Sequence, residues 1–348
     1  MIVLFYSDIH IRENSSYIGY NAISPRGMTL ELENYIRGIE FVSDSIKKYN
    51  PDIVFNLGDT VNIVDRLSIR ELTALSQISV IQDTCKNLSI PHIILQGNHD
   101  IYSLPKDSKD NQDTNLSHIS IGCILSKFCD KYVTDIEEYE YQGVNFSLIP
   151  YLQKTPEVLS AFLDSKHSMI LTHNEFQGSV YESGIQSNTS LVATKKIPIF
   201  SGHIHKPQIT GNITYVGSLI SNKFDRNIGF HGIGIYDTDK KKYSQIENTY
   251  SRHYIKCKNI DEMLALDPDR YLVKLQTRES KEEVENRLGE SHRYQYVYVR
   301  EIDRKDSVEI RYSVGRSQEP KVMLRNYLEE NNPDVLDIYD EVIDSKEE

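Results

Sequence analysis

The first hundred residues combine short apolar runs, polar clusters that directly follow them, and segments with helical periodicity. The apolar runs cover residues 2–6, 53–57 and 92–96. Between them, apolar residues recur at i, i+3 or i+4 and i+7, at residues 32–49 and again at residues 72–85. Strands that alternate with helices predict βαβ units and a parallel sheet, whose ligands gather at the carboxyl ends of its strands. All three polar clusters fall at that end.

A second set of apolar runs follows a polar segment at residues 103–117, which we expect to be a surface loop. These runs are short, rich in β-branched or aromatic residues and bounded by turn residues, at 144–152, 168–172, 197–201, 213–216 and 230–236. This pattern predicts a second sheet packed on the first. The expected architecture is α/β, a two-sheet α/β/β/α sandwich over residues 1–250.

The last hundred residues differ from the sandwich region, because the polar clusters at strand ends stop. Residues 251–316 carry 14 basic and 13 acidic side chains and contain alternating stretches, which predict a small α+β domain that we expect to cap the core and bind DNA. Residues 317–348 carry 3 basic and 10 acidic side chains and predict two amphipathic helices. The second helix starts at Asn332 as N-cap, with Pro333 at the first helical position.

Composition narrows the class of protein. The formal net charge of −12 argues against a simple basic coat for nucleic acid, and the fractions of 39% hydrophobic and 26% charged residues are typical of a soluble globular protein. No apolar run approaches the roughly 20 residues that a membrane span needs, and we expect the first apolar run, residues 2–6, to be a buried strand rather than a signal peptide, because it lacks a basic leader and a cleavage site. Four cysteines without a C-x-x-C pair favour a reducing compartment, and we expect a cytoplasmic protein.

The polar clusters share residue types that bind metals. Each cluster follows an apolar run, and an extended D-x-H or H-x-H segment points both side chains to the same side. Convergence of five segments would supply seven ligands, which suit two metal ions that share Asp59. The candidate ligands are Asp8, His10, Asp59, Asn98, His173, His203 and His205.

The donor set indicates the metals and the substrate. Nitrogen and oxygen donors without thiolate suit Mn²⁺, with Fe, Zn or Co as alternatives, whereas Mg²⁺ prefers all-oxygen sites. Two divalent ions against the two aspartates leave the site about +2, and a bridging water between the ions becomes a nucleophile for phosphorus. A phosphate ester is the expected substrate.

The order of the clusters, D-x-H, G-D, G-N-H-D, H and G-H-x-H, resembles the calcineurin-like metallophosphoesterases. The resemblance implies that Asp8, His10, Asp59 and His205 hold one metal, and that Asp59, Asn98, His173 and His203 hold the other. It also implies that His99 meets the phosphate and assists the leaving oxygen, with Asp100 to orient it. Many relatives carry Asp or His three residues after the bridging Asp, where this sequence has Asn62, so an acid–base role at this position is in doubt.

Within that superfamily the chain resembles the SbcD/Mre-type nuclease subunit of double-strand-break repair. The resemblance rests on the spacing of the first three clusters, on Tyr215-Val216-Gly217-Ser218 with Gly229-Phe230 further on, and on the two C-terminal segments. It implies a homodimeric DNA nuclease with 3′ to 5′ exonuclease and single-strand endonuclease activity. Its C-terminal helices would bind an SbcC-type coiled-coil ATPase, and the two proteins would act in DNA end processing, recombination and repair. The alternatives are a phosphatase or cyclic-nucleotide phosphodiesterase for small molecules, and a non-catalytic scaffold with a vestigial metal site.

Overall fold

The computed structural model describes residues 1–12, 26–62, 68–103, 118–151, 168–193, 197–226, 229–289 and 294–301. Residues 1–300 belong to one compact unit. Most of the predicted loop at 103–117 and the whole predicted helix pair at 317–348 lie outside the described residues. No helix in these ranges is long and apolar enough to cross a membrane.

The first sheet forms the centre of the sandwich and has the order β14-β13-β1-β2-β3-β6. Its strands are β1 (Ile2–Tyr6), β2 (Ile53–Asn56), β3 (His92–Leu95), β6 (Lys131–Val133), β13 (Gly232–Asp237) and β14 (Lys242–Glu247). The strands β1, β2, β3 and β6 are parallel, while β13 and β14 are antiparallel. The three predicted N-terminal strands are confirmed within one residue of their ends.

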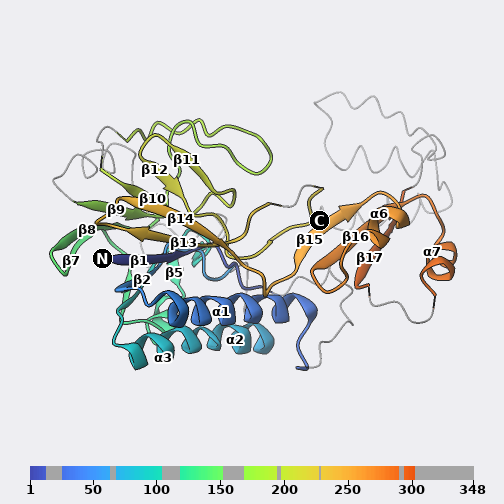
Figure 1. Ribbon diagram of the computed structural model, residues 1–348, viewed down its shortest axis with the longest axis horizontal. Helices are drawn as coiled ribbons and strands as arrows, with labels where there is room; N and C mark the ends of the chain where they lie inside the picture. Colours follow the sequence, from blue (N-terminus) through green and yellow to red (C-terminus); the bar gives the residue numbers. More distant parts are fainter. Residues whose placement is uncertain are drawn as a thin grey trace, which may run out of the picture. The chain divides into compact units, whose positions relative to one another are not determined.

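Helices α1 (Leu30–Tyr49), α2 (Ile69–Ser76) and α3 (Ile78–Leu88) cover one face of this sheet (Figure 1). The helical periodicity over residues 72–85 predicted one helix, but the structure has two there, α2 and α3. Ser68 and Glu71 form a capping box that starts α2, and Gln77 both ends α2 and begins α3. Apolar periodicity continues across such a junction, so it cannot reveal the break.

The second sheet has the order β11-β12-β10-β9-β8-β7 and packs on the first through a shared apolar layer that includes Phe5, Phe55, Phe146 and Phe200. Its strands are β7 (Glu137–Tyr141), β8 (Val144–Ile149), β9 (Met169–Thr172), β10 (Ile199–Ser201), β11 (Gln208–Thr210) and β12 (Ile213–Tyr215). The two-sheet α/β sandwich is therefore confirmed.

One predicted strand lies in the other sheet. Residues 230–236 were expected in the second sheet, but β13 pairs with β1 in the first, with Val3 opposite Tyr236. A run of alternating residues predicts a strand without specifying its neighbour, because alternation fixes only which side chains share a face of the sheet.

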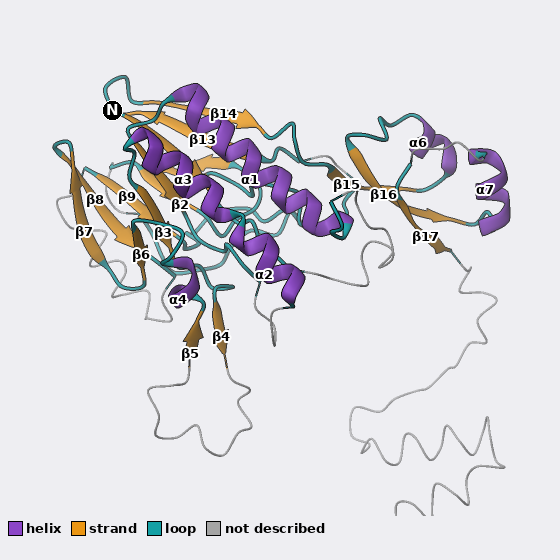
Figure 2. Ribbon diagram, turned by 90° about the horizontal axis from the view of Figure 1, so that it is seen from below, coloured by secondary structure: helices purple, strands orange, loops and turns teal. Residues whose placement is uncertain are grey.

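Smaller elements complete the described fold (Figure 2). Residues 253–300 form a three-stranded parallel sheet with two short helices: β15 (His253–Cys257), α6 (Ile260–Leu264), β16 (Tyr271–Thr277), α7 (Lys281–Leu288) and β17 (Tyr296–Arg300). A hairpin of β4 (Ile101–Ser103) and β5 (His118–Ser120) and the short helix α4 (Gly122–Leu125) follow β3. The domain boundaries at residues 250 and 316 stay predictions.

Candidate metal centre

The seven predicted ligands lie on loops that leave the carboxyl ends of five parallel strands. Because β1, β2 and β3 are parallel neighbours in one sheet and β9 and β10 in the other, these ends meet at one edge of the sandwich. The strands and their residues are β1 with Asp8 and His10, β2 with Asp59, β3 with Asn98 and His99, β9 with His173, and β10 with His203 and His205.

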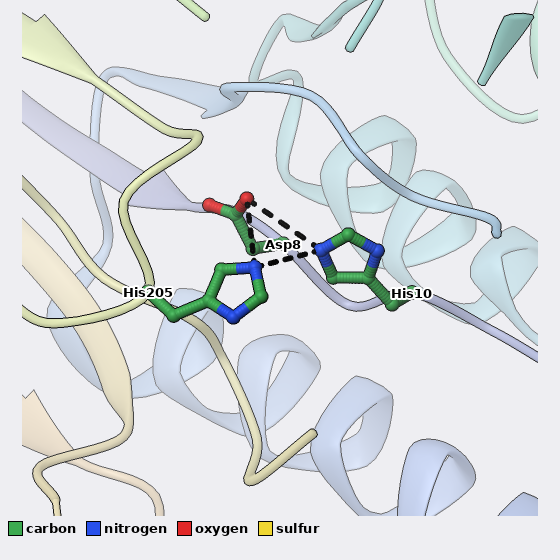
Figure 3. Close-up of side chains that lie close together, drawn as sticks. All are labelled: Asp8, His10 and His205. Carbon is green, nitrogen blue, oxygen red and sulfur yellow. Dashed lines mark hydrogen bonds and ion pairs between the residues drawn. The ribbon is translucent and has the colours of Figure 1, made fainter. Parts of the chain in front are cut away.

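Asp8, His10 and His205 form the first cluster, and their polar atoms point toward one another (Figure 3). The Nε2 atoms of His10 and His205 are 2.9 Å apart. Each of these nitrogens is 3.8 Å from Oδ1 of Asp8. The side chain of Asp8 is fully buried and that of His205 is 26% exposed, so the cluster opens to solvent on the His205 side.

Asp59, His173 and His203 form the second cluster, which Asn98 joins. Oδ1 of Asn98 is 3.2 Å from Nε2 of His173 and 2.9 Å from Nδ1 of His203. Oδ2 of Asp59 is 3.2 Å from the same His173 nitrogen. The members of this cluster are the four residues that the resemblance assigns to one metal.

Asp59 lies between the two clusters. The Oδ2 atom that faces His173 is also 3.5 Å from Nε2 of His10. His10, Asp59 and His99 make a third group of converging donor atoms. One carboxylate thus faces both clusters, as a bridge between two cations requires.

Two features of the protein atoms fit bound cations. Oδ2 of Asp8 is buried without a hydrogen-bond partner, and an unpaired buried carboxylate oxygen is costly unless a cation or a donor meets it. Gly97 lies so close to the bridge that a Cβ there would be 2.1 Å from Oδ1 of Asp59. The donors are nitrogen and oxygen throughout, so the residues present fit two divalent transition ions.

In the second cluster, the charge of Asp59 favours a proton on His173, at the place where a cation would bind. Burial raises the pKa of Asp59, but the imidazoles of His173 and His10 outweigh burial and hold it below its ordinary value. Burial lowers the pKa of His173, yet Asp59 reverses this and raises it to about 9. Burial lowers the pKa of His203 to about 3, so this ring is neutral. A cation bound there would have to displace a proton from His173.

The backbone at the site differs from the expected extended pairs. Asp8, His10, Asp59 and His203 all have left-handed φ values, of 53°, 55°, 53° and 73°. In the first segment these left-handed residues, rather than the pleat of a strand, bring Asp8 and His10 together. His203 and His205 enter separate clusters, in the arrangement that the resemblance implies for the two metals. Left-handed non-glycine residues cost energy and concentrate at functional sites.

Hydrogen bonds from neighbouring loops orient the rings. Nδ1 of His173 donates to the carbonyl oxygen of Leu57 over 2.6 Å, which turns its Nε2 into the site. Nδ1 of His99 lies 3.0 Å from Oδ1 of Asn62. Asp100 accepts instead from the backbone N–H groups of Val61 and Gly97. Sequence reasoning noted Asn62 as a departure from the family pattern and missed it as the orienting partner of His99.

The segment after β12 holds the first cluster in place. The backbone N–H of Ser218 donates to the carbonyl oxygen of His205 over 3.1 Å, and Nδ2 of Asn222 donates to that of Asp8 over 3.0 Å. Gly217 has φ 81° and passes so close to Pro207 that a Cβ would be 2.8 Å from its ring. This explains the Gly-Ser pair after β12.

A cavity of about 310 Å³ forms the mouth of the site, between the clusters and solvent. Its lining includes Asp59, His99 and His205, together with Glu182 and Lys223. The ammonium of Lys223 is 2.6 Å from a carboxylate oxygen of Glu182, whose carboxylate lies 4.0 Å from Nδ1 of His205. Neither residue stands in a motif, so the sequence offered no signal for them.

The sequence profile of the calcineurin-like phosphoesterase family matches residues 1–207, more than half of the chain. The chain belongs to this family. Comparison with curated proteins finds no significant match. The chain is similar to Yfce, a phosphoesterase from E. coli, at 12% identity and a TM-score of 0.32, covering 71% of this chain and 99% of the other. It is also similar to a dimetal phosphatase from Danio rerio, at 11% identity and a TM-score of 0.36, covering 68% of this chain and 91% of the other.

This calcineurin-like phosphoesterase thus has a metallophosphoesterase core whose described residues include a candidate site for two metal ions. Of the predicted site residues, all seven ligands and His99 lie at that one edge of the sandwich. Their assignment as ligands and as a catalytic residue is part of the proposal below.

Proposed function

We propose that this chain is a two-metal phosphodiesterase that hydrolyses DNA. The observation that carries the proposal is the shared carboxylate: Asp59 faces both donor clusters, at 3.5 Å from His10 and 3.2 Å from His173. Two ions that share one carboxylate match the two-metal arrangement for in-line displacement at phosphorus. The resemblance to SbcD-type nucleases supports DNA as the ester.

The seven ligands named above would hold the ions, and Mn²⁺ suits their nitrogen and oxygen donors best. Bound ions would supply positive charge for the phosphate and acidity for an attacking water. His99 lies beside Asp59 and lines the mouth, where it faces an incoming ester. Its Nδ1 is engaged by Asn62, so Nε2 is the atom that can meet the phosphate or the leaving oxygen.

The net charge of −12 is compatible with a DNA substrate. The last 32 residues account for 3 − 10 = −7 of it, which leaves −5 on residues 1–316. At the mouth, the carboxylate of Glu182 is paired with Lys223. A phosphate would therefore meet a field set by the two bound ions rather than by the overall charge.

The size of the mouth favours a second candidate, a phosphatase for a small molecule. A cavity of about 310 Å³ is at the lower end of the volumes typical of small-molecule sites. A small phosphomonoester would fit there without contacting the residues after the sandwich core.

The substrate test uses protein stripped with a chelator and reloaded with Mn²⁺, Zn²⁺ or Mg²⁺. We expect Mn²⁺ to give the fastest cleavage of single-stranded and linear duplex DNA, and a phosphomonoester to be hydrolysed far more slowly. Fast phosphomonoester hydrolysis without DNA cleavage would establish the second candidate instead.

The role of His99 has a separate test. His99→Ala should retain two metal ions per chain, because the seven ligands are intact, while DNA hydrolysis falls by about 10²-fold or more. Full turnover of this variant would remove His99 from the mechanism.

We propose the partners on the resemblance alone: a second copy of the chain and an SbcC-type coiled-coil ATPase bound by residues 317–348. Deletion of residues 317–348 should abolish ATPase binding in a pull-down and preserve nuclease activity. Retained ATPase binding, or loss of the fold in the shortened chain, would contradict this role.

A further inference from the structure

A second cavity of about 620 Å³ continues from the mouth of the metal site. It shares four lining residues with the mouth, which makes the two spaces neighbours: Glu182, Ser183, His205 and Lys223. A group attached to a phosphate at the metal site would therefore extend directly into the larger cavity.

Residues 182–183, 205–207, 221–223 and 225 line the larger cavity together with two further parts of the chain. One wall comes from the loop before β13, with Phe230 and His231, and the other from β15, with His253 and Tyr254. The rings of His231 and His253 lie 5.6 Å apart, and backbone hydrogen bonds fix the junction, since the N–H of Lys256 donates to the carbonyl oxygen of Asp225 over 2.7 Å. His231, His253 and Tyr254 are buried, whereas Phe230 is half-buried and is the most exposed ring of the lining.

The lining of the cavity carries two lysines, Lys206 and Lys223, and two carboxylates, Glu182 and Asp225. Lys206 directly follows the candidate ligand His205, and its side chain is exposed. Lys223 lies on the border with the mouth, where Glu182 holds it. A lysine ammonium binds phosphate as a point charge, so Lys206 can neutralise a phosphate next to the one at the metals.

We propose that this cavity binds the unpaired nucleoside attached to the scissile phosphate, with Phe230 stacking on the base and Lys206 pairing with the flanking phosphate. This nucleoside site rests on the proposed function, and it would restrict the DNA substrate to a single strand or a frayed end. Aromatic side chains with a basic groove are the elements that bind single strands without sequence preference. A base between these walls has left its own stack, which excludes an intact duplex at this position.

A binding experiment tests the cavity without catalysis. A short single-stranded deoxyoligonucleotide that contains 2-aminopurine is titrated into the full chain in the presence of a chelator. We expect stacking to quench the fluorescence, and Phe230→Leu and Lys206→Gln each to weaken binding about tenfold. The controls are Tyr250→Leu, an exposed aromatic residue outside the cavity, and Lys258→Gln. Equal affinity in all variants would overturn the proposal.

An inhibition experiment separates this inference from the proposed function. With Mn²⁺ and bis(p-nitrophenyl) phosphate as substrate, a deoxynucleoside 5′-monophosphate should inhibit at least tenfold more tightly than inorganic phosphate. In Phe230→Leu and Phe230→Ala that ratio should fall toward one. If the wild type binds the nucleoside monophosphate no more tightly than inorganic phosphate, the nucleoside site is refuted even if DNA is cleaved. If it binds the nucleoside monophosphate at least tenfold more tightly but cleaves no DNA, the proposed nuclease function is refuted and the nucleoside site stands.

Discussion

Gly97 gives the sharpest test of the shared carboxylate. Its φ is not in the left-handed region, so alanine there carries no backbone strain, and its effect comes from one added methyl group. That Cβ would lie 2.1 Å from Oδ1 and 2.2 Å from the backbone N of Asp59. Ordinary contact begins at 3.4 Å, so Asp59 and the backbone at Gly97 must move apart by about 1.3 Å.

A displacement of this size exceeds what metal coordination tolerates. Ligand distances hold within about 0.2 Å, and a misplacement of about 1 Å costs on the order of 10²-fold in rate. Because Asp59 faces both clusters, Gly97→Ala should weaken both ions together, by about 10-fold to 100-fold in affinity. Calorimetric titration of the stripped protein with Mn²⁺ measures the affinity, and hydrolysis of a small diester measures the rate.

Gly143→Ala is the matched control for this variant. Gly143 has φ 77°, lies in the turn between β7 and β8, and has nothing within 4 Å of an added Cβ. Alanine there should cost about 1 kcal/mol of folding stability through its backbone conformation and leave both metals bound. If Gly97→Ala bound two Mn²⁺ with wild-type affinity and kept its rate, the close approach at the bridge would have no functional meaning.

Three further predictions follow from single contacts. Asp59→Asn should lose both ions in metal analysis, because the amide cannot bridge them; full occupancy would refute the bridge. Asn62→Ala should lower kcat about tenfold with two metals retained, since it frees the His99 ring, whereas an unchanged kcat would show that this contact is idle. Burial lowers the pKa of His92 to about 4 from 6.5, so its stabilising contribution is present above pH 6.5 and declines by about 3 kcal/mol as the pH falls to 4. The free energy of unfolding of wild type and His92→Gln, measured by denaturation from pH 7 to 4, gives this loss. If the stability of the two proteins fell equally with pH, the prediction would be contradicted.

The position of the site was predictable from sequence because it depends on strand direction. Once β1, β2 and β3 are parallel, the residues after them must lie at one edge, whatever the loop conformation. The same reasoning failed for residues 230–236, because strand periodicity does not select a partner. It also failed for Glu182 and Lys223, which reach the mouth through tertiary packing and carry no motif.

The loop conformations could not be predicted, because contacts between distant segments impose them. The N–H groups of Asp8 and His10 donate to the carbonyl oxygens of Gly58 and Asp59, each over 3.0 Å, so the loop after β1 is bonded to the loop after β2. Left-handed φ at these residues costs of order 1–3 kcal/mol each, and buried hydrogen bonds between the loops offset that cost. Three left-handed residues, Asp8, His10 and Asp59, lie within these paired loops, so neither loop relaxes without breaking bonds to the other. These hydrogen bonds thereby hold Asp8, His10 and Asp59 in place at the candidate site, and this preorganisation is the contribution of the fold to it.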